Sequence, residues 1–198
     1  MKTVHASIRV LLCVAVGFVP LRGCVAQSQS VPPNSARRSA SAPRDGSHDF
    51  DFEIGRWKVH NSVLRHGANG APSWIEYDGI SVARRVWGGR AVLLELESET
   101  PAGHREGLVL RLYNPVAHQW STSFASSQDG ALNPPSVGEF RNGRAEFFGQ
   151  DQVDGRSVLT RSVLSNITVS SYKLEQAVSR DGGKSWEVMI VSDHTRTD

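Results

Sequence analysis

The last predicted strand, Trp186–Thr195, and the residue after it carry the side chains best suited to chemistry. Alternate positions bring Ser192, His194 and Arg196 onto one face, because successive side chains of a strand point to opposite sides. A hydroxyl, an imidazole and a guanidinium could hold the polar head of a small molecule. With a carboxylate they could instead form an acid–base site, and an imidazole in an apolar pocket could bind haem iron.

Other strand positions add candidates for a pocket. Trp120 and Phe124 fall on one face of a predicted strand, while Arg111, Arg161 and Glu175 place charges within strands. An inward arginine could meet a carboxylate, and an outward one would form a surface salt bridge. The predicted ligand-binding residues are Trp120, Phe124, Arg111, Arg161, Glu175 and His194.

No catalytic or metal motif stands out. The seven histidines lack the spacing of a metal site, and no serine lies in a Gly-x-Ser-x-Gly turn. Asp49, Asp51 and Glu53 gather acidic oxygens without the pattern of a calcium loop, so we interpret them as capping the first strand. We therefore predict no catalytic residue and no metal ligand, and favour a binding protein over an enzyme.

Period-two alternation and turn signals predict the elements that position these residues. In Gly55–Arg65, for example, Trp57, Val59 and Asn61 fall on one face, which predicts a strand with one buried side. Asn-Gly and Asp-Gly pairs, which favour tight hairpin turns, separate many of the strands. The predicted strands are Gly55–Arg65, Trp74–Val86, Ala91–Glu99, Glu106–Tyr113, Gln119–Ser126, Val137–Arg141, Ala145–Gln150, Ser157–Leu164, Tyr172–Ser179 and Trp186–Thr195.

Short turns between consecutive strands predict that each strand pairs with its neighbours in the sequence. Closing such a sheet removes its two exposed edges. The predicted fold class is all-β: a single antiparallel up-and-down meander barrel of about ten strands. A barrel of this size can hold one small ligand inside.

Two segments precede the predicted barrel domain of residues 48–198. Residues 1–26 have a basic start, a short apolar run and a small-residue cleavage site, a combination that is typical of an export signal. The apolar run is too short to span a membrane. Residues 27–47 are rich in Ser, Pro and Arg and are predicted to be a disordered linker. Leu21 to Cys24 resembles a bacterial lipobox, so a lipoprotein signal with a lipid anchor on Cys24 is an alternative. The expected location is the periplasm or the exterior.

The charge of the predicted barrel gives no case for nucleic acid as a partner. From His48 onward there are sixteen Lys and Arg against nineteen Asp and Glu, although the whole chain has a net charge of +2. Binding to nucleic acid rests largely on an excess of basic residues. Both cysteines precede the barrel, which therefore has no disulfide.

Gly55-x-Trp57 at the start of the first strand and Arg196 after the last one resemble the closure of calycin barrels, where the arginine lies across the indole. The chain also resembles a group of bacterial exported proteins with a lipocalin-like domain, over roughly residues 48–196. The shared patterns are His48 to Trp57, Trp87 to Gly89, Leu110 to Pro115, Pro134 to Gly138 and Asp181 to Trp186. The resemblance implies that Gly55, Trp57 and Arg196 close the barrel, and it brings no established activity.

This closure predicts which face of two strands lies inside. If Trp57 faces the interior, Val59 and Asn61 do so as well, and contact with Arg196 would bring His194 inside. By the same alternation, Trp186 and Val188 would also face inward.

Ser179–Trp186 is similar to the Asp-box hairpin of sialidase propellers, which there is a structural device. Propellers repeat the pattern at a fixed spacing, and here it occurs once. The segment is therefore predicted to be a rigid hairpin and no sign of sialidase activity.

Together these observations predict an exported barrel that binds a small apolar or amphiphilic molecule. One alternative is a hydrolase or isomerase with a site at the barrel mouth, formed by His194, Arg196 and a carboxylate. Another is an envelope interaction module without a small-molecule ligand. No cofactor is predicted in the main reading; haem bound through His194 is an alternative, because nitrobindin-like barrels hold haem through a histidine near the C-terminus.

Overall fold

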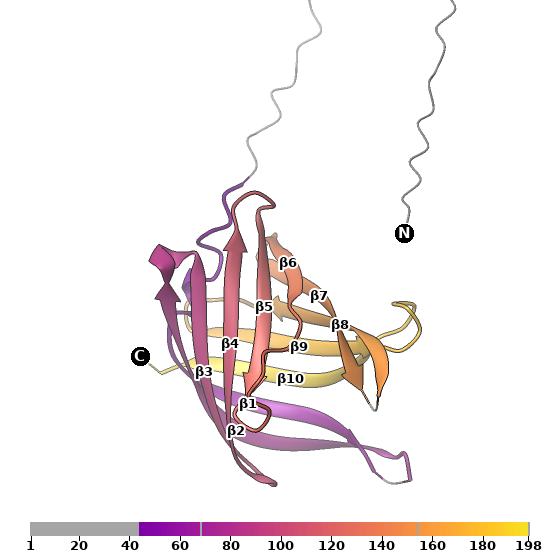
Figure 1. Cartoon of the computed structure of the whole chain (residues 1–198). Coiled ribbons are helices and arrows are strands. Elements are labelled where there is room, and N and C mark those ends of the chain that lie inside the picture. The colour runs from indigo at the N-terminus through magenta and orange to yellow at the C-terminus, as the bar shows by residue number, and fades with distance from the viewer. Residues whose placement is uncertain (1–43, 68, 154, 198) are drawn as a thin grey trace, which may run out of the picture. The chain divides into compact units, whose positions relative to one another are not determined.

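The computed structural model describes residues 44–67, 69–153 and 155–197, in which ten antiparallel strands close into one barrel (Figure 1). Each strand pairs with its neighbours in the sequence, and β1 pairs with β10. This confirms the predicted up-and-down barrel. The strands are β1 (Gly55–His66), β2 (Pro72–Val86), β3 (Ala91–Thr100), β4 (Gly103–Asn114), β5 (Gln119–Ser126), β6 (Ser136–Arg141), β7 (Arg144–Val153), β8 (Arg156–Ser165), β9 (Ser171–Ser179) and β10 (Glu187–Arg196).

The pairing of β1 with β10 closes the barrel and fixes which residues share its interior. Trp57 stands opposite Arg196, Val59 opposite His194, and Asn61 opposite Ser192. Directly opposed residues of an antiparallel pair point to the same face. The predicted parity of these two strand segments is therefore confirmed.

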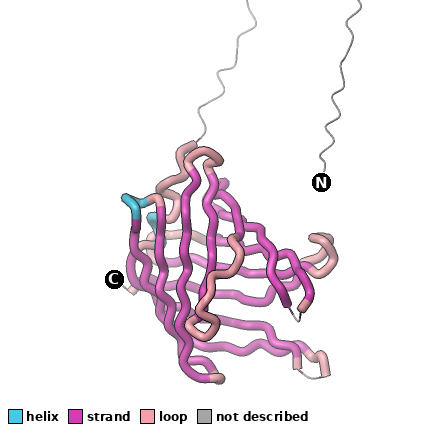
Figure 2. The backbone as a smooth tube through the Cα atoms, in the orientation of Figure 1, coloured by secondary structure: helices cyan, strands magenta, loops and turns pink. Residues whose placement is uncertain are grey.

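One end of the barrel is packed solid and is called the floor below. Its buried aromatic residues come from the ends of strands that meet there, and two short 3₁₀ turns, Asp51–Glu53 and Trp87–Gly89, lie at the same end (Figure 2). Edge-to-face ring packing is favourable beyond the area it buries. The main aromatic residues of the floor are Phe50, Trp57, Tyr113, Trp120, Phe147 and Tyr172.

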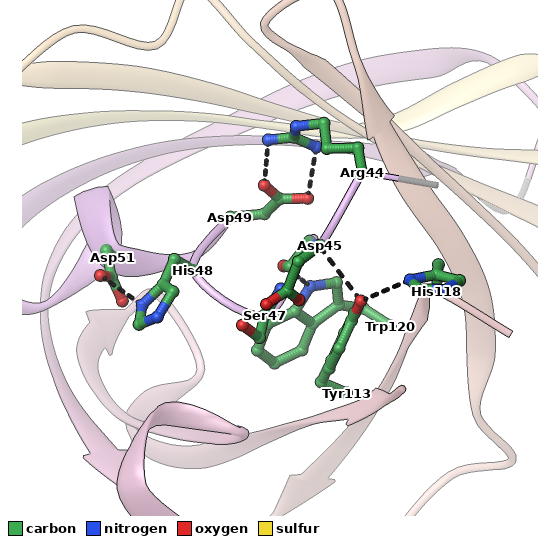
Figure 3. A network of polar contacts seen from close by, with 10 residues as sticks. Arg44, Asp45, Ser47, His48, Asp49, Asp51, Tyr113, His118 and Trp120 are labelled. Atoms are coloured by element: carbon green, nitrogen blue, oxygen red, sulfur yellow. Dashed lines mark hydrogen bonds and ion pairs between the residues drawn. The ribbon is translucent and has the colours of Figure 1, made fainter. Parts of the chain in front are cut away.

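The segment before β1 completes this floor. Phe50 is 1% exposed and packs edge-to-face on Trp120 at 4.9 Å between ring centroids. The backbone of Gly46 donates to the Tyr113 hydroxyl and accepts from the Trp120 indole, at 3.1 and 2.9 Å (Figure 3). Within the described residues, contacts thus extend upstream of His48 to Arg44, which pairs with Asp49. The predicted export signal, the Cys24 anchor and the rest of the predicted linker lie outside the described residues.

The seam between β5 and β6 is the shortest in the barrel. Only three residue pairs join these strands, from Trp120–Gly138 to Thr122–Ser136. Beyond these pairs, an isolated β-bridge between Ala125 and Leu132 joins the loop between β5 and β6 to β5. The half of this seam away from the floor therefore depends on loop contacts.

A β-bulge in β10 corrects one prediction of the alternation. The register with β9 shifts between Val188 and Ile190, which inserts one residue and reverses the faces on either side. Trp186 consequently packs outside the barrel, against Phe148 and under the guanidinium of Arg161. The prediction that Trp186 and Val188 face inward with His194 is wrong for this reason.

Candidate functional site

A cavity of about 710 Å³ occupies the barrel above the floor and extends toward the opposite end. This volume lies within the usual range of small-molecule pockets. Arg111 and His194 lie at its floor end, whereas Arg65, Arg105 and Gln128 lie at the open end. Gly107, which also lines the cavity, makes room for the ring of Phe124, because a Cβ at this position would lie 2.7 Å from that ring.

A buried ion pair underlies the cavity. The Arg111 guanidinium donates from Nε and Nη2 to the two carboxylate oxygens of Glu53, at 2.9 and 2.8 Å. Both side chains are almost completely buried. The Tyr172 hydroxyl also donates to Glu53 Oε1, at 3.2 Å. Burial, followed by the negative charge of Glu53, raises the pKa of Tyr172 well above its ordinary value, so the phenol stays protonated.

His194 lies against this ion pair as a neutral imidazole. Its ring stacks on Tyr172 at 4.0 Å between centroids, and it is 5% exposed. Within the part of the chain that the structure describes, neither ring nitrogen has a hydrogen-bond partner. Burial, and then the positive charge of Arg111, lowers the pKa of His194 to about 3. The floor end of the cavity therefore contains one balanced ion pair and an uncharged histidine.

Arg196 lies across the indole of Trp57, 4.2 Å from the ring centroid, so the contact expected of a calycin closure is present. Its guanidinium also donates to the carbonyl oxygens of Ile54, Phe52 and Val169. These contacts place Arg196 in the floor. His194 and Arg196 thus lie at the closed end, and the structure does not bring them together at the barrel mouth, where the enzyme alternative placed them.

The six predicted ligand-binding residues separate into three locations. Arg111, His194 and Phe124 line the cavity, and Trp120 is buried in the floor beneath it. Glu175 is on the outer face, as its strand pairing shows, whereas Arg161 borders the cavity and turns its guanidinium outward onto Trp186. Arg161 stands opposite the half-exposed Phe148 and stacks on Trp186, while Glu175 stands opposite Val163 and Val191.

The placement of His194 does not fit the haem alternative. An axial ligand must present a ring nitrogen to the iron along an open path. Both nitrogens of His194 are enclosed by protein atoms, and the flat side of the ring is covered by Tyr172. The ring would have to leave this stack before either nitrogen could reach an iron in the cavity.

The sequence pattern missed Glu53 as the partner of Arg111. Its acidic neighbours suggested a capping role, and 58 positions separate the two residues. A usable signal was present, because Glu53 stands directly between Phe52 and Ile54, and a carboxylate buried with such neighbours requires a cation. An inward arginine on a neighbouring strand would be that cation.

The Ser179–Trp186 segment forms the rigid hairpin that its pattern indicates. The carboxylate of Asp181 accepts hydrogen bonds from the backbone and hydroxyl of Ser185 and from the hydroxyl of Ser179. These bonds lower the pKa of Asp181 to about 2. They fix the turn between β9 and β10 and leave the Asp181 carboxylate committed to structure.

Neither a metal-binding cluster nor a membrane-spanning helix is present among the described residues. No group of three or more His, Cys, Asp or Glu side chains there is arranged to hold a metal ion. In the same residues, no helix has the length and apolar character needed to cross a membrane.

Comparisons with known proteins identify the architecture. No family model and no curated protein matches the chain. Among solved structures, an S-type phycobiliprotein lyase, CPES from Guillardia theta, superimposes with a TM-score of 0.54 at 9% identity, over 78% of this chain and 94% of that one. A redesigned β-barrel matches at a TM-score of 0.40 and 10% identity, over 78% and 96% of the two chains, which is too low to support an argument. The chain therefore has a calycin-like fold, a closed antiparallel up-and-down barrel.

Proposed function

We propose that this barrel binds a small, largely apolar molecule in its interior. The observation that carries the proposal is the cavity of about 710 Å³, enclosed by strands and closed at one end by the floor. Aliphatic side chains such as Val63, Leu96 and Ile190 line the cavity. An apolar ligand would remove their surface from water, which favours binding. The lyase neighbour supports the architecture, and at 9% identity it does not name a ligand for this chain.

The cavity can be tested by filling it. Leu96 lines the cavity, whereas Leu108 is 43% exposed and stands next to the inward Gly107 on β4, so it points outward. We expect Leu96→Trp to weaken binding of the neutral fluorophore N-phenyl-1-naphthylamine by about tenfold or more, because the indole occupies the ligand's space. The matched variant Leu108→Trp should bind like the wild type.

Native mass spectrometry of the freshly purified protein gives an independent readout. A retained small molecule that is released on unfolding would support the proposal. Failure of the wild type to bind any neutral apolar probe, or unchanged binding by a folded Leu96→Trp variant, would refute it.

The proposal places this binding outside the cytoplasm, on the strength of the signal-like residues 1–26. Fractionation of cells that express the full chain tests it, with recovery in the periplasm or medium expected. Cys24→Ser separates the two modes of export, since only a lipid-anchored protein would move from the membrane fraction to the soluble one. Recovery of the wild type in the cytoplasm would contradict the proposed location.

A further inference from the structure

The cavity is lined by aliphatic and polar side chains together. On β1–β4 aliphatic residues are interspersed with polar and charged ones, while β5–β9 present a row of hydroxyl and amide groups. The aliphatic members are Val59, Val63, Ile75, Leu96 and Val109. The polar members are Thr122, Ser136, Thr160, Ser162 and Gln176. A ligand that fills this space would meet both aliphatic side chains and hydrogen-bonding groups.

The hydroxyl groups of Ser136 and Thr160 lie close together over Gly149, which has no side chain. Ser136 on β6 and Thr160 on β8 flank Gly149 of β7, where a Cβ would collide with Ser136 Oγ and lie 3.1 Å from Thr160 Oγ1. Both residues line the cavity, and in the described part of the chain neither hydroxyl bonds to another side chain. By contrast, Ser162 accepts from Gln176, and Ser192 donates to Asn61. The Ser136–Thr160 pair is thus available to a ligand.

The floor end restricts the charge of that ligand. Arg111 has five N–H donors, of which two bond to Glu53 and one reaches Thr122 at 3.4 Å. Its charge is already balanced by Glu53, so an anionic head would bring a second negative charge to the same guanidinium. A cationic head would be repelled by Arg111 and would find no negative charge on His194, which is neutral. A buried charge without a partner is costly.

We propose that the inner part of the cavity, next to the floor, selects an uncharged, oxygen-bearing apolar molecule, such as a ketone or an alcohol. Its oxygen atoms accept hydrogen bonds from Arg111 at the floor or from Ser136 and Thr160 on the wall, while its apolar body lies against the aliphatic side chains. This inference rests on the proposed function and adds the chemical class of the ligand.

A matched series of small aromatic compounds tests the selection on the wild-type protein. The compounds are naphthalene, 2-acetylnaphthalene, 2-naphthoate and 2-naphthylmethylammonium, each competing with N-phenyl-1-naphthylamine at pH 7.4. We expect the ketone to bind about tenfold or more tightly than either charged compound and severalfold more tightly than naphthalene. Equal or tighter binding of the carboxylate, or no advantage of the ketone over naphthalene, would overturn the inference while the proposed function stands. If the fluorophore itself does not bind, the proposed function fails first.

Removing one hydroxyl tests the wall. Thr160→Val preserves the shape of the side chain, and we expect it to lower the affinity for 2-acetylnaphthalene severalfold while naphthalene binds as before. The matched change Thr195→Val, on the exposed face of β10, should alter neither affinity. Ser136→Ala provides a second measurement if the first variant folds poorly. Unchanged ketone affinity in both folded variants would remove Ser136 and Thr160 from the proposal.

Discussion

The floor and the cavity wall of this barrel both contain polar side chains, but those of the floor are hydrogen-bonded to one another, whereas, among the described residues, two hydroxyls of the wall are not. At the floor, both carboxylate oxygens of Glu53 accept hydrogen bonds from Arg111, and the Tyr172 hydroxyl adds another. On the wall, the hydroxyls of Ser136 and Thr160 face open space. Polar groups that bond to one another hold the fold together, whereas unbonded groups beside a cavity are available to a ligand. Substitutions at the floor should therefore change stability first, and those on the wall should change binding first.

The largest effect is expected from removing Glu53. Glu53→Ala leaves the Arg111 guanidinium buried without a counter-charge, which should lower the free energy of unfolding by about 3–5 kcal/mol. Urea unfolding followed by circular dichroism measures the change. The control is Glu95→Ala, on the exposed outer face of β3, with a change within about 0.5 kcal/mol. Similar losses in both variants would show that the ion pair adds nothing to the floor.

Two adjacent phenylalanines give a matched test of the same boundary. Phe147 is fully buried in the floor, while Phe148 is 50% exposed on the outer face. Phe147→Ala should destabilise the protein by about 3–5 kcal/mol, and Phe148→Ala by about 1 kcal/mol or less. Comparable unfolding midpoints in urea for the two variants would contradict the assignment of faces on β7.

His194 links stability to pH at the junction of the two regions. Its pKa is about 3 in the folded protein against an ordinary value of 6.5, so the unfolded chain binds a proton in this window that the folded chain excludes. The free energy of unfolding should therefore fall as the pH falls from 6.5 toward 3, with no contribution above 6.5. Between pH 6.5 and 4.5 the wild type should lose about 2–3 kcal/mol more than His194→Phe, whose ring can still stack on Tyr172. Parallel pH profiles in urea unfolding would show that His194 is not held neutral.

The smallest of these effects is expected at Arg196. Arg196→Lys keeps a positive charge but loses the planar fork that covers Trp57 and reaches three carbonyl groups. A loss of about 1–2 kcal/mol is expected in the same unfolding assay. Arg156→Lys, at the exposed start of β8, is the control and should have no measurable effect. Full stability of Arg196→Lys would mean that a charge alone suffices to close the floor.

The strand order followed from the sequence because period two and the turn residues act locally. Trp57 and Arg196 also set the register of β1 against β10 correctly. Alternation alone could not tell which face of an isolated strand is inside. Glu175, which points outward, and Arg161, whose guanidinium stacks on the outward Trp186, were therefore predicted to bind a ligand together with Arg111. The bulge after Val188 reversed Trp186 in the same way, since one inserted residue exchanges the faces of a strand.

The short seam between β5 and β6 has a consequence for motion in the barrel wall. Its three residue pairs offer fewer interstrand hydrogen bonds than any other seam, so its local opening requires the least free energy. Residues Gly149–Val153 of β7 pair with β8 but lie beyond the last residue pair that joins β6 to β7, so those of their backbone amides that point toward β6 have no strand partner among the described residues. Their hydrogens should exchange with solvent deuterium well before those of Ala145–Phe147, as mass spectrometry of peptides can measure. The wall beside the open half of the cavity would then open transiently by local unfolding, while the floor remains folded.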